Sequence, residues 1–271
     1  HKGNVLTEIV EIEYRQFEIT SSWDGSRQPS LFWFPEGRKN VPLVVGLHTW
    51  SHDRFNQLDN YLPLCKERGW ALLLPEFRGP NLRGNPNRDL ACGSAAARQD
   101  IVDAVNFVAE HEAVDPRKLF LLGASGGGHM ALLTAAFTPG LWRAVEAWCP
   151  ITDLREWHAF YGPGNRYAAE LEYCLGGEPG CSPEVEAEYR SRSPVNFLKE
   201  LAKVNLSVHH GRHDKIVPYR ITYRFAALLE EVGPERFYFD FFDGGHEADN
   251  LRSFAWFEKQ LSHVRRASVT G

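Results

Sequence analysis

The segment KLFLLGASGGGHMALLTAAF, residues 118–137, reveals the fold most directly. It opens with an unbroken apolar run at 119–122, which is typical of a strand buried on both faces of a sheet, and it ends in a helical pattern. Between the two lies Gly-Ala-Ser-Gly-Gly, a GxSxG turn centred on Ser125. Such a turn is so sharp that the first and last of these positions must lack bulk, and glycine occupies both. The segment therefore predicts Ser125 as a nucleophile raised above the end of a buried strand.

Outside this segment, short apolar runs continue to alternate with helical stretches. Strand and helix in turn indicate right-handed βαβ units, and hence an α/β fold with a mostly parallel central sheet and helices on both faces. The expected strands are 43–47, 71–74, 119–122, 144–148, 204–209 and 237–242, and the expected helices are 58–67, 94–110, 127–137 and 219–231.

Two regions depart from this alternation. Residues 1–40 alternate polar and apolar side chains, which predicts antiparallel N-terminal strands with one wet face. Residues 150–194 are rich in aromatic residues, Gly and Pro, and we expect them to form a small cap insertion over the carboxyl ends of the strands, where open α/β sheets bind ligands. Because no repeat or Pro/Ser linker divides the sequence, residues 1–271 are predicted to form a single domain.

Composition excludes several classes of function. The net charge is −5 and no basic run stands out, which argues against a nucleic-acid partner. The apolar runs are strand-sized and fall far short of the roughly 20 residues that cross a bilayer, so no membrane partner is expected and the protein is predicted to be soluble. The first residue is His rather than Met, which leaves the compartment open between cytoplasm and a secreted or periplasmic location. The oligomeric state is also left open.

The cysteines and histidines do not form a metal-binding pattern. The five cysteines match neither zinc spacing nor a dense disulfide framework, although Cys174 and Cys181 bracket a Gly-Gly-Glu-Pro-Gly turn and are placed to pair in an oxidising compartment. His48 and His52 have a permissive spacing for a metal, but no carboxylate or cysteine pattern completes a site. The sequence therefore predicts neither a metal nor a cofactor.

A serine nucleophile needs a base and an acid that orients the base, and two later segments supply them. Asp214 follows the expected strand 204–209, and His246 lies between glycines and Glu247 just after the expected strand 237–242. Three strand ends thus bring a serine, an acid and a histidine to one edge of the sheet. They follow one another in the chain order serine, acid, histidine, which is the order found in enzymes with this GxSxG turn, known as the nucleophile elbow. We therefore predict Ser125, Asp214 and His246 as the catalytic residues.

Other residues compete for these roles. Asp240 and Asp243 lie near His246 in the sequence and are rivals for the acid, and Asp214 also suits a helix cap before 217–218. His129 lies one helical turn after Ser125, so we expect it to pack against the sheet or to make a polar contact rather than to act as the base.

The oxyanion of the reaction requires two donors. The backbone N–H of Gly126, at the start of the helix after the elbow, is the first. The second is expected from the loop 48–52, and we assign it to the N–H of Trp50, with Thr49 as the alternative.

Taken together, these motifs resemble the prolyl-oligopeptidase-like α/β-hydrolases, over roughly residues 30 to 265. The resemblance is carried by GLHTW at 46–50, PEFRG at 75–79, VDPRK at 114–118, the elbow around Ser125, Asp214 with Val-Pro at 217–218, and GHE at 245–247. It implies an α/β-hydrolase fold and a Ser-His-Asp triad that works through an acyl-enzyme without a cofactor. In this family the residue two after the oxyanion-loop histidine commonly lends its N–H, which favours Trp50. Thr49 departs from the family, which often has glycine there.

The resemblance leaves the substrate to be inferred. Peptidase members usually carry an N-terminal β-propeller, and its absence here favours a serine carboxylic-ester hydrolase acting on a small-molecule ester, carbohydrate-linked or not. A serine peptidase or amidase is the alternative, and a catalytically inactive binding module is the alternative from another class. We expect Trp50, Trp157, Phe160 and Tyr161 to line the substrate pocket as stacking faces, although aromatic residues in such numbers also belong in a core.

Overall fold

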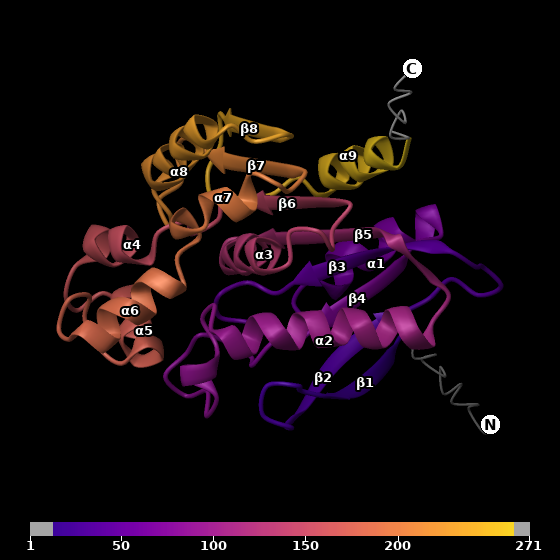
Figure 1. Cartoon of the computed structure of the whole chain (residues 1–271), viewed down its shortest axis with the longest axis horizontal. Coiled ribbons are helices and arrows are strands. Elements are labelled where there is room, and N and C mark those ends of the chain that lie inside the picture. Colours follow the sequence, from indigo (N-terminus) through magenta and orange to yellow (C-terminus); the bar gives the residue numbers. More distant parts are fainter. Residues whose placement is uncertain (1–12, 263–271) are drawn as a thin grey trace, which may run out of the picture.

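Eight strands form one sheet, in the order β1-β2-β4-β3-β5-β6-β7-β8 (Figure 1). The computed structural model describes residues 13–262. The strands are β1 Arg15–Thr20, β2 Arg27–Trp33, β3 Val41–Leu47, β4 Ala71–Pro75, β5 Val114–Ala124, β6 Ala144–Trp148, β7 Leu206–Gly211 and β8 Phe237–Phe242. The helices are α1 Leu58–Arg68, α2 Ala95–His111, α3 Gly126–Phe137, α4 Leu154–Tyr161, α5 Arg166–Leu175, α6 Pro183–Ser191, α7 Leu198–Leu201, α8 Tyr219–Val232 and α9 Asn250–Ser262, with short 3-10 turns η1 Arg88–Leu90 and η2 Pro194–Asn196.

The pairing of the strands confirms the predicted fold class. Strands β1 and β2 pair antiparallel, and β2 pairs antiparallel with β4. All pairs from β4 to β8 are parallel. The antiparallel strands predicted within residues 1–40 are therefore present at β1 and β2, while residues 1–12 lie outside the described part of the chain.

Helices cover both faces of the sheet, and each face has its own core. On one face, α2, α3, α7 and α8 pack on the sheet through residues such as Ile101, Leu132 and Phe225. On the other face, α1 and α9 contribute Tyr61, Phe254 and others. Burial of this apolar surface is the main force that holds the layers together, at roughly 25 cal/mol per Å². Every parallel strand but the edge strand β8 is thus enclosed, which explains the continuous apolar runs in the sequence.

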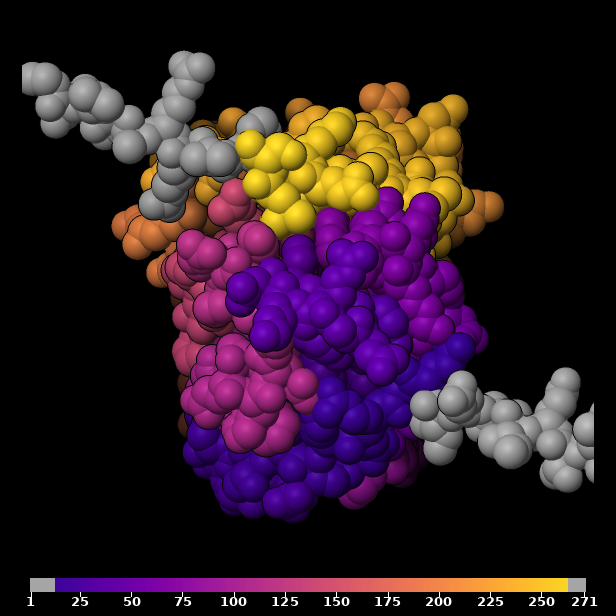
Figure 2. All heavy atoms as spheres, turned by 90° about the vertical axis from the view of Figure 1, so that its right-hand side faces the viewer, coloured from indigo at the N-terminus to yellow at the C-terminus, as the bar shows by residue number. Residues whose placement is uncertain are grey.

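Helices α4, α5 and α6 lie between β6 and β7 in the chain and gather at the side of the sheet where the parallel strands end (Figure 1). Each begins at a side chain that accepts hydrogen bonds from the backbone of the first turn, namely Asp153, Asn165 and Ser182. These three helices are called the cap below. Their apolar side chains form a small core that includes Trp157 and extends to Trp50. Figure 2 views the molecule from the opposite end, where the N-terminal strands and α9 lie at the surface.

The structure does not contain the bond between Cys174 and Cys181 that the sequence left open. Both cysteines are free, because Cys174 lies on the inner face of α5 and is buried, whereas Cys181 is exposed in the turn that follows the helix. The thiol of Cys174 faces that of Cys92 within the core of the cap instead. Within residues 13–262, no helix combines the length and the apolar composition of a membrane span.

His129 is fully buried in α3, and its Nε2–H donates to the carbonyl of Arg192 at 2.7 Å. As predicted, it makes a structural contact and does not face Ser125. Burial lowers the pKa of His129 to about 4, further helped by the positive charges of Arg98 and Arg192, and the hydrogen bond only partly opposes this shift. The imidazole is therefore neutral in the folded protein at neutral pH.

Replacing His129 with glutamine should weaken the dependence of folding stability on pH. Between the folded pKa and the unfolded value of about 6.5, the unfolded chain binds a proton that the folded chain excludes, so stability falls as the pH falls. His129 should account for about 2 kcal/mol of the free energy of unfolding that the wild type loses between about pH 7.5 and about pH 5. Urea unfolding at both pH values measures this, with the exposed His213→Gln as control. An unchanged pH dependence in His129→Gln would contradict the assignment.

Candidate active site

The turn between β5 and α3 holds Ser125 in a strained conformation, with φ 55° and ψ −119°. Its backbone N–H donates to the carbonyl of Trp148 on β6 at 2.8 Å, which fixes the turn to the sheet. A side chain at Gly123 would overlap the carbonyl of Gly127, and a Cβ at Gly127 would lie 2.6 Å from the carbonyl oxygen of Leu47. The two glycines of the motif are therefore required by the close approach of strand, turn and helix.

Ser125, His246 and Asp214 form a continuous chain of hydrogen bonds. The Ser125 hydroxyl donates to Nε2 of His246 at 2.9 Å, and Nδ1–H of His246 donates to Oδ2 of Asp214 at 2.7 Å. Asp214 lies in the loop after β7, and His246 lies in the loop after β8. The side chain of Asp214 is fully buried, while that of His246 is 20% exposed, as a base that must reach a substrate requires.

Asp214 is held as an anion by its neighbours. Burial opposes its ionisation, but hydrogen bonds from His210, His246 and the backbone N–H of Val217 outweigh this and hold the pKa of Asp214 well below its usual range. Its Oδ1 accepts from the N–H groups of Ile216 and Val217 at 2.8 and 2.9 Å. The carboxylate is thus fixed in place and charged, and it can stabilise a positive imidazole beside it.

His210 is a contributor that sequence reasoning did not identify. Its ring is fully buried, and Nε2 lies 2.8 Å from the carbonyl oxygen of Val217 and 3.2 Å from Oδ2 of Asp214. A proton on Nε2 therefore faces both acceptors. In the sequence, its position four residues before Asp214, at the end of a buried strand, was the feature that could have identified it as a neighbour of the catalytic acid.

The rival acids have other partners. Asp240 faces His209 and Arg252, and Asp243 accepts from His213 at 2.7 Å on the surface. Asp214 is therefore the acid in contact with His246.

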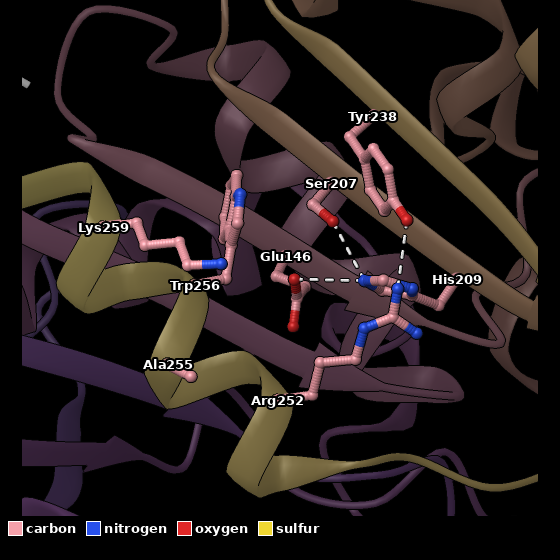
Figure 3. Close-up of a pocket in the computed structure, with 8 residues that line it drawn as sticks. All are labelled: Glu146, Ser207, His209, Tyr238, Arg252, Ala255, Trp256 and Lys259. Carbon is pink, nitrogen blue, oxygen red and sulfur yellow. Dashed lines mark hydrogen bonds and ion pairs between the residues drawn. The ribbon is translucent and has the colours of Figure 1, made fainter.

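A second Ser-His-Asp array lies near α9 and consists of Ser207, His209 and Asp240. Ser207 and His209 line a cavity of about 340 Å³ that Ser125 does not line (Figure 3). Ser207 lies 3.0 Å from Nε2 of His209, whose Nδ1 lies 3.2 Å from Asp240. However, Nε2 of His209 also faces the buried carboxylate of Glu146 at 3.2 Å. Glu146 therefore competes with Ser207 for the same ring nitrogen of His209. Ser207 is also 1% exposed and lies within an extended strand, so this array is a buried polar network.

The loop after β3 brings Trp50 to the start of α3. A Cβ placed on Gly126 would lie 2.6 Å from the backbone nitrogen of Trp50, so the two backbones meet closely. The N–H of Thr49 donates to Asn56 at 3.0 Å and is therefore occupied. Within residues 13–262, no acceptor lies on the N–H of Trp50. The arrangement favours Trp50 over Thr49 as the second oxyanion donor beside Gly126.

The histidines of this loop serve to anchor it. His48 stacks on Phe77 with ring centroids 3.9 Å apart and lies 2.8 Å from the carbonyl oxygen of Glu76. His52 lies 3.0 Å from the hydroxyl of Thr49. Among the described residues, the one group with metal-ligating spacing is Cys149, His210 and Asp214, and Asp214 there already bonds to His246.

The four predicted pocket residues lie together but differ in exposure. Trp50 is 4% exposed and Trp157 is 1% exposed, with their rings edge to face at 4.9 Å. Tyr161 is partly buried and donates through its hydroxyl to the carbonyl of Ile216, while Phe160 is 52% exposed. Neither indole therefore has a free face on which a sugar can stack. These two rings join the cap to the oxyanion loop.

Comparison with known proteins agrees with this geometry. The model of the prolyl oligopeptidase family matches residues 56–268. The chain is 24% identical over 261 residues to acylamino-acid-releasing enzyme 1 of Oryza sativa subsp. japonica, which covers 88% of this chain and 33% of that protein. It is 26% identical over 193 residues to the acylamino-acid-releasing enzyme of Homo sapiens, and this alignment covers 69% of this chain and 26% of that protein.

Among solved structures, a puromycin-hydrolyzing peptidase of Mycobacterium tuberculosis superposes with a TM-score of 0.75 at 20% identity, covering 97% of this chain and 42% of that one. The chain thus spans about a third or less of the length of these two curated relatives. The family model covers most of the fold, including the elbow and the loops after β7 and β8. This chain belongs to the prolyl oligopeptidase family.

Proposed function

We propose that this chain is a serine peptidase that cleaves N-acylated aminoacyl bonds or short peptides, with Ser125 as nucleophile, His246 as general base and Asp214 as the orienting acid. The observation that carries this proposal is the hydrogen-bonded chain from Ser125 through His246 to Asp214, in a member of the prolyl oligopeptidase family. The curated relatives named as acylamino-acid-releasing enzymes support the choice of substrate class.

The mechanism follows from the positions of these groups. His246 takes the proton from Ser125 as the hydroxyl attacks the carbonyl of the scissile bond, and the charge of Asp214 stabilises the imidazolium that forms. The N–H groups of Trp50 and Gly126 face the developing oxyanion. His246 then protonates the leaving amine, and an acyl-enzyme remains on Ser125. Water, activated by the same histidine, releases the acid.

This proposal places the peptidase first, whereas the sequence favoured an ester hydrolase. That preference did not rest on the chemistry at Ser125. The expected role of aromatic stacking faces for a carbohydrate-linked ester also loses its support, because Trp50 and Trp157 are buried against each other. Ester cleavage by the same machinery is still expected, since an ester is the easier acyl substrate.

A panel of chromogenic substrates tests the proposal. It should contain N-acetylated aminoacyl anilides, unblocked aminoacyl anilides and the matching acyl esters, each assayed with the wild type and with Ser125→Ala. We expect the wild type to cleave at least one class of anilide and the variant to cleave the same anilide at least roughly 10^4-fold more slowly. Ester turnover with no anilide cleavage across the panel would return the carboxylic-ester hydrolase to first place. Failure of a fluorophosphonate to label Ser125 would instead favour an inactive binding module.

A further inference from the structure

The indole of Trp50 is tied to the cap. Its Nε1–H donates to Oε2 of Glu170 on α5 at 2.7 Å. Both side chains are nearly enclosed, with Trp50 4% and Glu170 6% exposed. A hydrogen bond from a buried donor to a carboxylate is about twice as strong as one between neutral groups, and its loss leaves a buried N–H without a partner.

A second contact joins the same helix to the next residue of the loop. Arg166, one turn before Glu170 on α5, donates through Nε to Oε1 of Glu170 at 2.8 Å. Its guanidinium also donates to the hydroxyl of Ser51 at 2.7 Å. Two adjacent residues of the oxyanion loop are therefore held by one helix of the cap, and Glu170 bonds both to Trp50 and to Arg166, which holds Ser51.

Hydrogen bonds hold the backbone on both sides of the Trp50 N–H. The carbonyl of Trp50 accepts from the N–H of Asn81 at 2.9 Å, and the N–H of Thr49 donates to Asn56. The side chain supplies the remaining restraint on Trp50, and Glu170 is its polar anchor. Because the N–H of Trp50 carries no acceptor in the described structure, its direction depends on these restraints.

We propose that Glu170 is a positioning residue for the oxyanion hole, acting through the Trp50 indole to aim the Trp50 N–H at the developing charge. This rests on the proposed acyl-transfer function, because it assigns the N–H of Trp50 to the oxyanion. It also makes the cap part of the catalytic apparatus, since α5 determines the geometry of a loop that follows β3. A donor misplaced by a fraction of an ångström loses much of its value in the transition state.

The test compares Glu170→Leu, Glu170→Gln and Trp50→Phe. Leucine removes the acceptor, phenylalanine removes the donor but keeps an aromatic ring, and glutamine keeps a neutral acceptor at the same reach. We expect Glu170→Leu and Trp50→Phe each to lower kcat by roughly 10- to 100-fold with KM changed less than about threefold. Glu170→Gln should recover most of the loss. The double variant Glu170→Leu/Trp50→Phe should have a kcat no lower than that of the less active of its two single variants, because both substitutions remove the same hydrogen bond.

The matched control is Glu172→Leu, on the same helix. Glu172 contacts His158 at 2.8 Å and does not reach the oxyanion loop, so its kcat should stay within about threefold of the wild type. Titration of active sites with a fluorophosphonate corrects every rate for misfolded protein. A peptidyl boronate, whose hydroxyl occupies the oxyanion hole, should bind Glu170→Leu more weakly in proportion to the loss of kcat.

The outcomes separate the two proposals. If the wild type cleaves no anilide, the peptidase proposal fails, but the rate of fluorophosphonate labelling still reports on the oxyanion hole and should fall in Glu170→Leu and not in Glu172→Leu. Normal kcat and normal labelling per folded molecule in Glu170→Leu would overturn the role of Glu170. A loss confined to KM would overturn it as well, because it would show a contribution to substrate binding alone.

Discussion

Replacing Ser125 with alanine is expected to lower turnover by roughly 10^4- to 10^6-fold, measured as kcat on the best anilide or ester substrate. Alanine removes the oxygen that attacks the substrate and that donates to His246 at 2.9 Å. The oxyanion donors and the histidine remain, so a small residual rate above the uncatalysed reaction should persist. A variant with near-normal turnover would refute the assignment of the nucleophile.

The same position should show a trade-off between stability and activity. Ser125 has φ 55°, which is costly for a residue with a Cβ and easy for glycine. We therefore expect Ser125→Gly to be as inactive as Ser125→Ala but more stable, by about 1 kcal/mol or more. Urea unfolding of the two variants side by side provides the comparison, and equal stability would show that the turn stores no strain.

The sequence predicted best those features that are set by local patterns. Strand β8 was expected at 237–242 and is observed at Phe237–Phe242, because a short apolar and aromatic run between turn residues has few alternatives. The meeting of Ser125, Asp214 and His246 could also be predicted, since each follows a parallel strand and the carboxyl ends of such strands share one edge of the sheet.

Features that depend on contacts between distant segments were not predictable. Nothing in the local sequence of Trp50 indicates that its indole is buried against Trp157 and bonded to Glu170, 120 residues further along the chain. The spacing of Cys174 and Cys181 left a disulfide bond open, but the periodicity of α5 turns Cys174 inward. Strand β5 begins at Val114, earlier than the expected 119, because its polar first half lies outside the apolar run.

Replacing Asp214 with asparagine is expected to lower kcat by roughly 10^3- to 10^4-fold while leaving the fold intact. The amide oxygen can still accept from the N–H groups of Ile216 and Val217, as Oδ1 does now. The amide NH2 would then face His246 where Oδ2 now accepts a proton. It would stabilise the tautomer that carries its proton on Nε2, and that nitrogen could no longer take the proton of Ser125.

The control for this prediction is Asp240→Asn. Asp240 is one of the two acids that compete with Asp214 in the sequence, yet it lies in the network around His209 and Arg252 and does not contact His246. Its replacement should therefore change kcat by less than about threefold. The two variants decide which carboxylate orients the base, because each leaves the other in place. If Asp240→Asn lost activity and Asp214→Asn kept it, the chain of hydrogen bonds through Asp214 would not be the catalytic one.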